Sequence, residues 1–146
     1  MNITTYIKKN NIPHRITGSE MHQVCNLEIK NKGITSLKGF VQNGELDLRD
    51  NKIKNLRGFK QSGYLDIRGN PINTIKGADT SLNIHICRWM FVQKGEMLTI
   101  NCKTKKIKAW DKFFKKNKTY ITKADSIEYK EIKRIFNLYK KNHYEL

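Results

Sequence analysis

The chain has 146 residues, and its 29 Lys and Arg against 13 Asp and Glu give a formal net charge of +16. The length suits one domain with a hydrophobic core. The charge permits binding to nucleic acid, an anionic membrane or an acidic protein, although a composition rich in Lys, Ile and Asn would produce it without any function. Three cysteines, an odd number, argue against a disulfide framework, and no apolar run is long enough for a membrane span.

The first 24 residues lack the long apolar stretch of a signal peptide. Their main apolar side chains are Tyr6, Ile7, Ile12 and Ile16. The segment that follows is repetitive, and an array of repeats would expose its core and a strand edge at each end. We therefore predict that residues 1–24 form an N-terminal cap.

A pattern with a period of 19 residues begins at Leu27 and starts again at Leu46 and Leu65. Each copy has two alternating apolar residues, an Ile five residues after the second, and then a glycine; these glycines are Gly39, Gly58 and Gly77. The alternation recurs at 84–86 and 100–102, so we count five coils, the fourth shortened to 16 residues. A fixed short period of this kind indicates a solenoid.

The predicted fold class is therefore an α/β solenoid of about five 19-residue coils over residues 25–113. Each coil would add one strand to a parallel sheet, with one face of the strand buried. The predicted inward residues are Leu27, Ile29, Leu46, Leu48, Leu65, Ile67, Ile84, Ile86, Ile100 and Cys102. Asn51 and Asn70 would hydrogen-bond the turns that leave the strands. Nineteen residues leave no room for a full helix, so few or no helices are expected on the outer side.

The pattern resembles the leucine-rich repeat, whose core is Leu-x-x-Leu-x-Leu-x-x-Asn-x-Leu. It is most similar to the short repeats of bacterial and bacteriophage proteins, with the run Asn-Lys-Ile-Lys-Asn-Leu-Arg-Gly-Phe at 51–59, and the resemblance covers roughly residues 24–113. Lys32, Trp89 and Lys105 replace the expected Asn in the other coils. The resemblance implies a concave face built from the parallel strands and used to bind a partner, and a convex face opposite it.

Residues 114–146 follow the repeats and form a predicted C-terminal basic cap of the same structural domain. Their apolar residues have helical spacing and are Ile127, Ile132, Ile135, Phe136 and Tyr139. Asp125 and Glu128 can act as a capping pair. We predict a helix at about 126–142.

The outward strand residues would form columns across the concave face, an acidic column beside a basic one. The predicted partner-binding residues are Lys30, Asp47, Arg49, Tyr64, Asp66, Arg68, His85 and Lys103. One interpretation is a ladder that neutralises itself and relieves repulsion between stacked coils. The other is a docking surface with Tyr64 and Arg68 as anchors, since Tyr and Arg dominate binding hot spots.

Lysines are concentrated elsewhere, on the turn side and near the C-terminal end. The candidate nucleic-acid-binding residues are Lys38, Arg57, Lys76, Lys105, Lys106, Lys108, Lys112, Lys115 and Lys116. Trp110, Phe113, Phe114 and Tyr120 are interleaved with them, and basic residues with aromatics can bind single strands. The alternative is that Trp110 and Phe113 are core residues and the lysines form a solvated face.

Two His/Cys pairs, His22 with Cys25 and His85 with Cys87, suggest zinc. Their coils lie three strand spacings of about 4.8 Å apart, which is too far for shared ligation, and Cys87 is predicted to point outward. No nucleotide-binding loop or zinc-protease helix is present. We expect no metal, no cofactor and no enzymatic activity.

These features together predict a non-catalytic interaction module that binds a protein partner through its concave face. By the resemblance, it would be a phage-type accessory protein or an inhibitor of a host protein. The alternative is a nucleic-acid-binding protein that uses the lysines. We expect a monomer that does not bind membranes and is cytoplasmic, in the host cytoplasm if the protein is viral.

Overall fold

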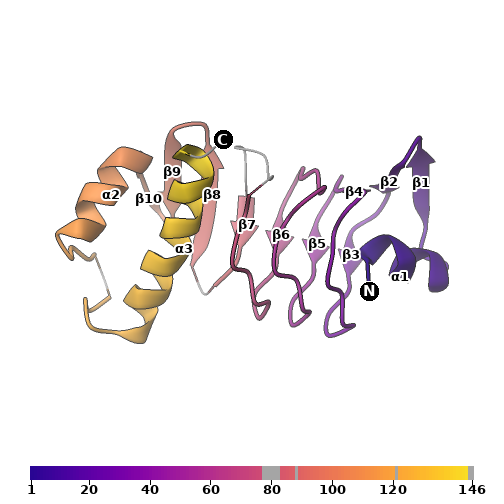
Figure 1. Cartoon of the computed structure of the whole chain (residues 1–146), viewed down its shortest axis with the longest axis horizontal. Coiled ribbons are helices and arrows are strands. Elements are labelled where there is room, and N and C mark those ends of the chain that lie inside the picture. The colour runs from indigo at the N-terminus through magenta and orange to yellow at the C-terminus, as the bar shows by residue number, and fades with distance from the viewer. Residues whose placement is uncertain (77–82, 88, 121, 145–146) are drawn as a thin grey trace.

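The computed structural model describes residues 1–76, 83–87, 89–120 and 122–144. In this part of the chain, three helices and ten strands form a mixed α/β fold with two sheets (Figure 1). The elements are α1 (Ile3–Lys9), β1 (His14–Thr17), β2 (Glu20–Gln23), β3 (Leu27–Glu28), β4 (Phe40–Val41), β5 (Leu46–Asp47), β6 (Leu65–Asp66), β7 (Asn83–His85), β8 (Met90–Lys94), β9 (Met97–Ile100), β10 (Lys103–Lys106), α2 (Ile107–Lys115) and α3 (Ile127–Tyr144).

The larger sheet has seven strands in the order β10-β9-β8-β7-β6-β5-β3. From β3 to β7 the strands are parallel, and each pairing joins residues 19 apart, with Leu46 opposite Leu27, Leu65 opposite Leu46 and Ile84 opposite Leu65. From β7 to β10 they are antiparallel. The smaller sheet has the order β1-β2-β4, with β1 antiparallel and β4 parallel to β2.

The predicted fold class is wrong, because the chain does not continue as five coils with one parallel sheet. Residues 90–106 form antiparallel strands β8 to β10 instead of completing two more coils. Two-residue turns cause the reversal, at Gly95–Glu96 and at Asn101–Cys102. Gly95 has φ 58° and Asn101 has φ 57°, a backbone region that short hairpin turns need and that Gly and Asn adopt most easily. The alternating apolar residues are strands as predicted, but the turns set their direction.

The expectation of few or no helices on the outer side is also wrong. Helix α2 occupies the segment predicted as the fifth coil, and it buries Ile107, Trp110 and Phe114, whose spacing of three and four residues is that of a helix. Helix α3 lies where the sequence predicted one at about 126–142, and it packs alongside the antiparallel strands (Figure 1). Its Tyr139 stacks on Phe91 of β8 with ring centres 5.3 Å apart.

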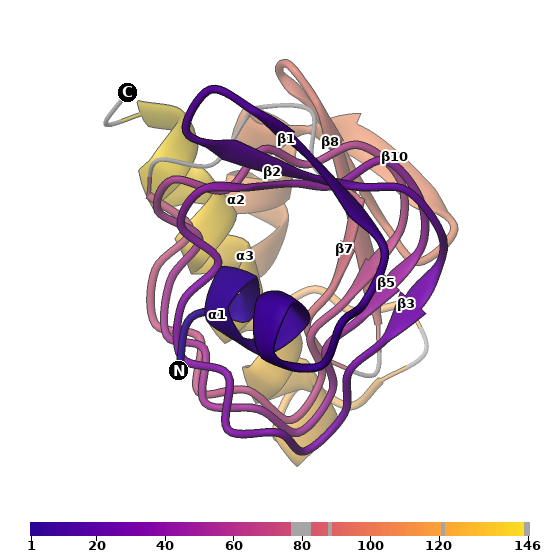
Figure 2. The same ribbon diagram turned by 90° about the vertical axis from the view of Figure 1, so that its right-hand side faces the viewer.

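Helix α1 lies across the N-terminal end of the repeats (Figure 2). Its Ile3 and Ile7 are fully buried, and the Ile3 amide donates to the Ser36 carbonyl at 2.9 Å. The side chain of Asn2 caps the helix by accepting from the Thr4 amide. Ile16 was expected to contribute to the same apolar contact, but it lies on β1 and is 53% exposed.

Amide side chains hold neighbouring repeats together at two positions of the period. The buried Asn51 accepts from the amides of Lys32 and Ile34, both at 3.0 Å, and donates to the carbonyls of Ile29 and Leu48. Asn70 repeats this one period later, as the sequence predicted. At a second position, Gln23, Gln42 and Gln61 each donate to two backbone carbonyls, one of them in the next repeat. The sequence analysis missed these glutamines, although they too recur every 19 residues.

One glycine of the repeats permits a close approach of two chain segments. Gly63 has φ 109°, and a Cβ atom there would lie 2.8 Å from the Gly44 carbonyl oxygen. A side chain at this position would therefore push the two repeats apart. Gly39 and Gly58 also have positive φ, as their predicted place in the bend requires, and Gly77 lies outside the described residues.

Replacing Asn51 by Ala leaves two amides and at least two carbonyls of adjacent repeats without their partner. We expect Asn51→Ala to lower the free energy of unfolding by about 2–4 kcal/mol, because buried unsatisfied groups keep their desolvation cost. The exposed Asn73, whose side chain makes no hydrogen bond to the described residues, is the matched control, and Asn73→Ala should change stability by less than about 0.5 kcal/mol. Urea unfolding followed by circular dichroism measures both, and equal effects would contradict the assignment.

Candidate functional site

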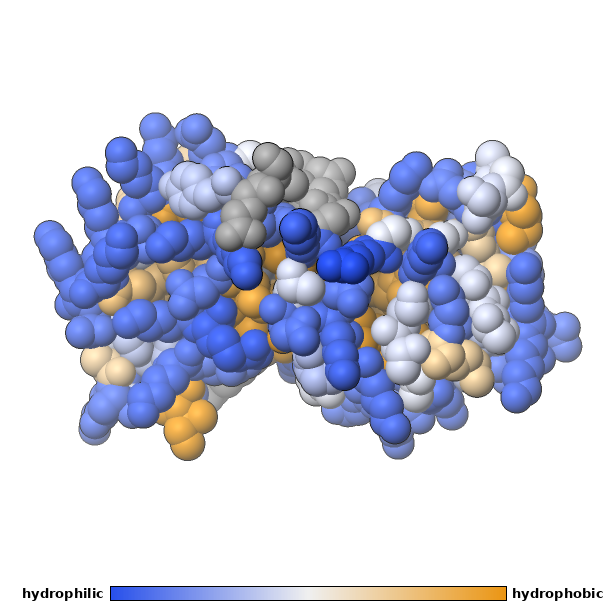
Figure 3. All heavy atoms as spheres, in the orientation of Figure 1, coloured by the Kyte–Doolittle hydropathy of each residue, from blue (hydrophilic) through white to orange (hydrophobic). Residues whose placement is uncertain are grey.

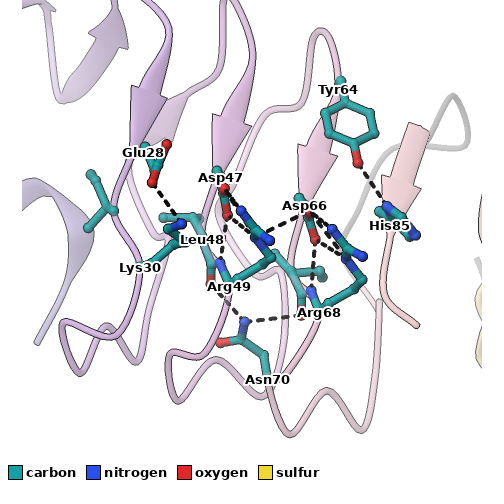
Figure 4. Close-up of polar contacts among 12 residues, drawn as sticks. Glu28, Lys30, Asp47, Leu48, Arg49, Tyr64, Asp66, Arg68, Asn70 and His85 are labelled. Atoms are coloured by element: carbon teal, nitrogen blue, oxygen red, sulfur yellow. Dashed lines mark hydrogen bonds and ion pairs between the residues drawn. The ribbon is translucent and has the colours of Figure 1, made fainter. Parts of the chain in front are cut away.

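The exposed side of the parallel strands carries a set of charged and polar side chains that we call the ladder face (Figure 4). Its members are Glu28, Lys30, Asp47, Arg49, Tyr64, Asp66, Arg68 and His85. Register places Asp47 beside Glu28, Asp66 beside Asp47 and His85 beside Asp66. Neighbouring strands lie about 4.8 Å apart, so carboxylates in one column would repel one another without counterions.

Each carboxylate of the ladder face has its counterion two residues later on the same strand segment. Lys30 contacts Glu28 at 2.8 Å, and Arg49 and Arg68 contact Asp47 and Asp66 at 2.7 Å through Nη2. Arg49 and Arg68 also donate through Nε, so both pairs are bidentate. The predicted self-neutralising ladder is therefore present in the geometry.

Asp66 links two repeats. Its side chain is only 5% exposed, and besides Arg68 it has Arg49 of the preceding repeat at 3.6 Å. Burial works to raise the pKa of the Asp47 carboxyl, but the hydrogen bonds and charge of Arg49 outweigh it and hold that pKa below its ordinary value. Hydrogen bonds to the two carboxylates raise the pKa of Arg49 and of Arg68. These charges therefore persist across the neutral pH range.

Tyr64 and His85 extend the ladder face beyond the ion pairs. The Tyr64 hydroxyl lies 2.8 Å from Nδ1 of His85, and the two rings meet edge to face. Burial, with the nearby Asp66 charge, raises the pKa of Tyr64, so its hydroxyl stays protonated at neutral pH.

A hollow of about 310 Å³ lies beside Tyr64 on this face. Its lining comprises Asn26, Leu27, Glu28, Glu45, Leu46, Asp47, Tyr64 and Asp66. Four of these residues are acidic, and none is basic, on a chain whose net charge is +16. Glu28 and Glu45 were not among the predicted site residues, although their phase in the repeat places both on the strand side. The hollow is a local exception to the charge of the whole protein.

Lys103 does not join the other predicted partner-binding residues. It begins β10, and β8 and β9 separate that strand from β7. Its ammonium group lies 5.0 Å from the centre of the Tyr120 ring instead. The assignment of Lys103 to the ladder column followed from the fifth coil, which the hairpins replace.

The predicted basic residues fall into two separate groups. Lys38, Arg57 and Lys76 are exposed on the turn side of successive repeats. Lys105, Lys106, Lys108, Lys112, Lys115 and Lys116 lie on β10, along α2 and at its end. Lys115 pairs with Asp111 at 2.9 Å, whereas the other eight have no carboxylate within 4.0 Å among the described residues. In Figure 3, hydrophilic side chains crowd the end of the molecule that carries α2 and α3.

The cysteines do not lie as expected. Cys87 is buried and Cys102 is exposed, the reverse of the prediction, and Cys25 is exposed. Burial raises the pKa of the Cys87 thiol. The described residues contain no group of three or more His, Cys, Asp or Glu that could hold a metal ion. Their helices include none that is long and apolar enough to cross a membrane.

Comparison with protein families, with curated proteins and with solved structures gives no match for the chain. The resemblance of residues 24–113 to leucine-rich repeats therefore remains a hypothesis. The site must be interpreted from its own geometry.

Replacing Asp66 by Asn removes the carboxylate between two arginines and leaves them facing each other. We expect Asp66→Asn to lower the free energy of unfolding by about 2 kcal/mol, less than for a fully buried pair because both arginines are partly exposed. Glu28→Gln breaks a pair whose carboxylate is 65% exposed and should cost less than about 0.5 kcal/mol. Urea titrations of both variants measure the difference, and a larger effect at Glu28 would refute the linking role of Asp66.

Proposed function

We propose that the protein is a non-catalytic interaction module that binds a protein partner at the ladder face. The observation that carries the proposal is the acidic hollow beside Tyr64, bordered by side chains already held in place by ion pairs. Ordered side chains lose little conformational entropy on binding, so such a face is prepared for contact. A module of this kind acts as an adaptor or as a stoichiometric inhibitor.

The charge of the hollow indicates which group of the partner would enter it. Arg49 and Arg68 already neutralise Asp47 and Asp66, while Glu45 is exposed and has no ion pair in the described part of the chain. A Lys or Arg side chain of the partner would pair with Glu45 and Glu28 and pack against the Tyr64 ring. Because like charges repel, nucleic acid is a poor ligand for this hollow.

The test compares the double variant Glu45→Lys/Tyr64→Ala with wild type in a pull-down from native lysate, quantified by mass spectrometry. We expect recovery of the protein enriched by wild type to fall at least about tenfold, because the variant inverts a charge and removes an aromatic anchor. Glu96→Lys/Tyr144→Ala makes the same chemical changes at exposed positions on the β8–β9 turn and at the end of α3. Equal recovery with all three proteins would count against the ladder face.

A second candidate function, binding of nucleic acid, is favoured by the lysines of β10 and α2 that have no acidic partner among the described residues. Their charge is uncompensated locally, in contrast to the ladder face. Phosphates are the natural counterions for such a group, and each contact releases bound salt ions from the nucleic acid.

Fluorescence anisotropy with labelled single-stranded DNA tests this second function. We expect micromolar binding that weakens at least about a hundredfold between low and physiological salt, because several phosphate contacts are lost together. Lys106→Ala/Lys108→Ala/Lys112→Ala should weaken binding more than Lys8→Ala/Lys9→Ala/Lys52→Ala, which removes the same charge from the N-terminal half. Absence of binding at low salt would exclude the function.

A further inference from the structure

A pocket of about 100 Å³ opens between β10, α2 and the segment that leads to α3. Its lining is dominated by aromatic rings, chiefly Trp89, Trp110, Phe113, Tyr120 and Tyr129. We call it the aromatic pocket. It lies beyond the antiparallel strands, away from the ladder face, and neither proposed function uses it.

The rings of the aromatic pocket form one continuous cluster that reaches the surface. Trp110 meets Phe113 edge to face with centres 5.2 Å apart, and Phe113 stacks on Tyr120 at 5.1 Å. Trp110 is buried and its indole donates to the Leu98 carbonyl at 2.7 Å, whereas Tyr120 is 50% exposed. The buried part is thus a rigid wall, and the exposed part leaves apolar ring surface at the opening.

Two lysines are held over these rings by the aromatic faces and not by carboxylates. The Lys103 ammonium lies 5.0 Å from the Tyr120 centre, and that of Lys105 lies 5.5 to 5.7 Å from the centres of Tyr120, Trp110 and Phe113. The two residues alternate along β10 and so point to the same side of the strand. Neither has an acidic partner in the described ranges, so both positive charges are available to an anion.

The aromatic pocket also contains a polar group without a protein partner. Tyr129 is 3% exposed, and its hydroxyl makes no hydrogen bond to the described residues. Burial raises the pKa of this phenol, so it remains protonated. A buried hydroxyl of this kind is costly unless a ligand supplies an acceptor or a donor.

We propose that the aromatic pocket binds a single planar ring that carries an anionic group, with the ring against Trp110 and Phe113 and the anion on Lys103 and Lys105. An apolar cavity of about 150 Å³ holds a benzene molecule, so a smaller cavity that is open on one side suits one ring whose substituent extends outward. A pyrimidine nucleotide has this chemistry: ring carbonyl and imino groups that can meet the Tyr129 hydroxyl, and a phosphate for the lysines.

Such a ligand has two sources, a free nucleotide or a residue within single-stranded nucleic acid. The second source rests on the candidate nucleic-acid function described above, whereas the first does not. Stacking of a base on exposed aromatic side chains would serve either source.

Intrinsic fluorescence provides the test, because the chain has two tryptophans and both line the aromatic pocket. We expect uridine monophosphate to quench this fluorescence saturably, uridine to do so only at higher concentration, and inorganic phosphate to have no effect. Lys103→Ala/Lys105→Ala should weaken binding of the monophosphate at least about tenfold, the loss of a charge-assisted contact, while changing that of uridine less than about twofold. Lys108→Ala/Lys112→Ala, on the exposed side of α2, removes the same charge and should change neither by more than about threefold.

Three results would overturn the proposal: no saturable quenching, quenching by phosphate alone, or equal losses in the two double variants. Oligo(dT) separates the proposal from the nucleic-acid function. Binding of oligo(dT) by anisotropy without quenching, and without sensitivity to Lys103→Ala/Lys105→Ala, would refute the pocket and leave that function standing. Quenching by the monophosphate without binding of oligo(dT) would support a free nucleotide as the ligand and refute the nucleic-acid function.

Discussion

Hydrogen bonds from buried amide side chains fix the register between successive repeats, and the rest of the structure depends on that register. Asn51 satisfies two amides of the preceding repeat with one oxygen, and Gln42 donates to carbonyls of its own repeat and of the next. The strands in this region are only two or three residues long, so backbone pairing alone would hold them weakly. A shift of one residue would also turn the buried leucines toward solvent.

The same register decides how the charges are arranged. It aligns Asp47 with Asp66 at a separation that would be repulsive, and the arginines two residues later remove the repulsion. As a result the ladder face is nearly neutral, and its adjoining hollow is acidic. The excess of positive charge lies on the turn side and around α2, where it has few local counterions. One chain therefore presents two surfaces of opposite electrostatic character, suited to different partners.

Strand positions were well predicted, while strand direction and the C-terminal architecture were not. Alternation of apolar residues identifies a strand by its two faces, and it located β3, β5, β6, β7 and part of β9. It contains no information on whether the next strand runs forward or back. That choice lay in the turns at Gly95 and Asn101, which the search for a fifth coil passed over. The helical spacing of Ile107, Trp110 and Phe114 was likewise fitted to the wrong period.

The 19-residue period, the inward leucines, the turn asparagines and the charge ladder follow from local order in the sequence, because residues one period apart occupy the same place in successive turns. The acidic hollow and the aromatic pocket depend on tertiary structure, because each gathers side chains from segments with no fixed relation in the sequence. Lys103 shows the difference: its phase pointed to the ladder face, but antiparallel packing carries it to the ring of Tyr120. Side-chain type could be assigned from the sequence, whereas neighbourhood required the fold.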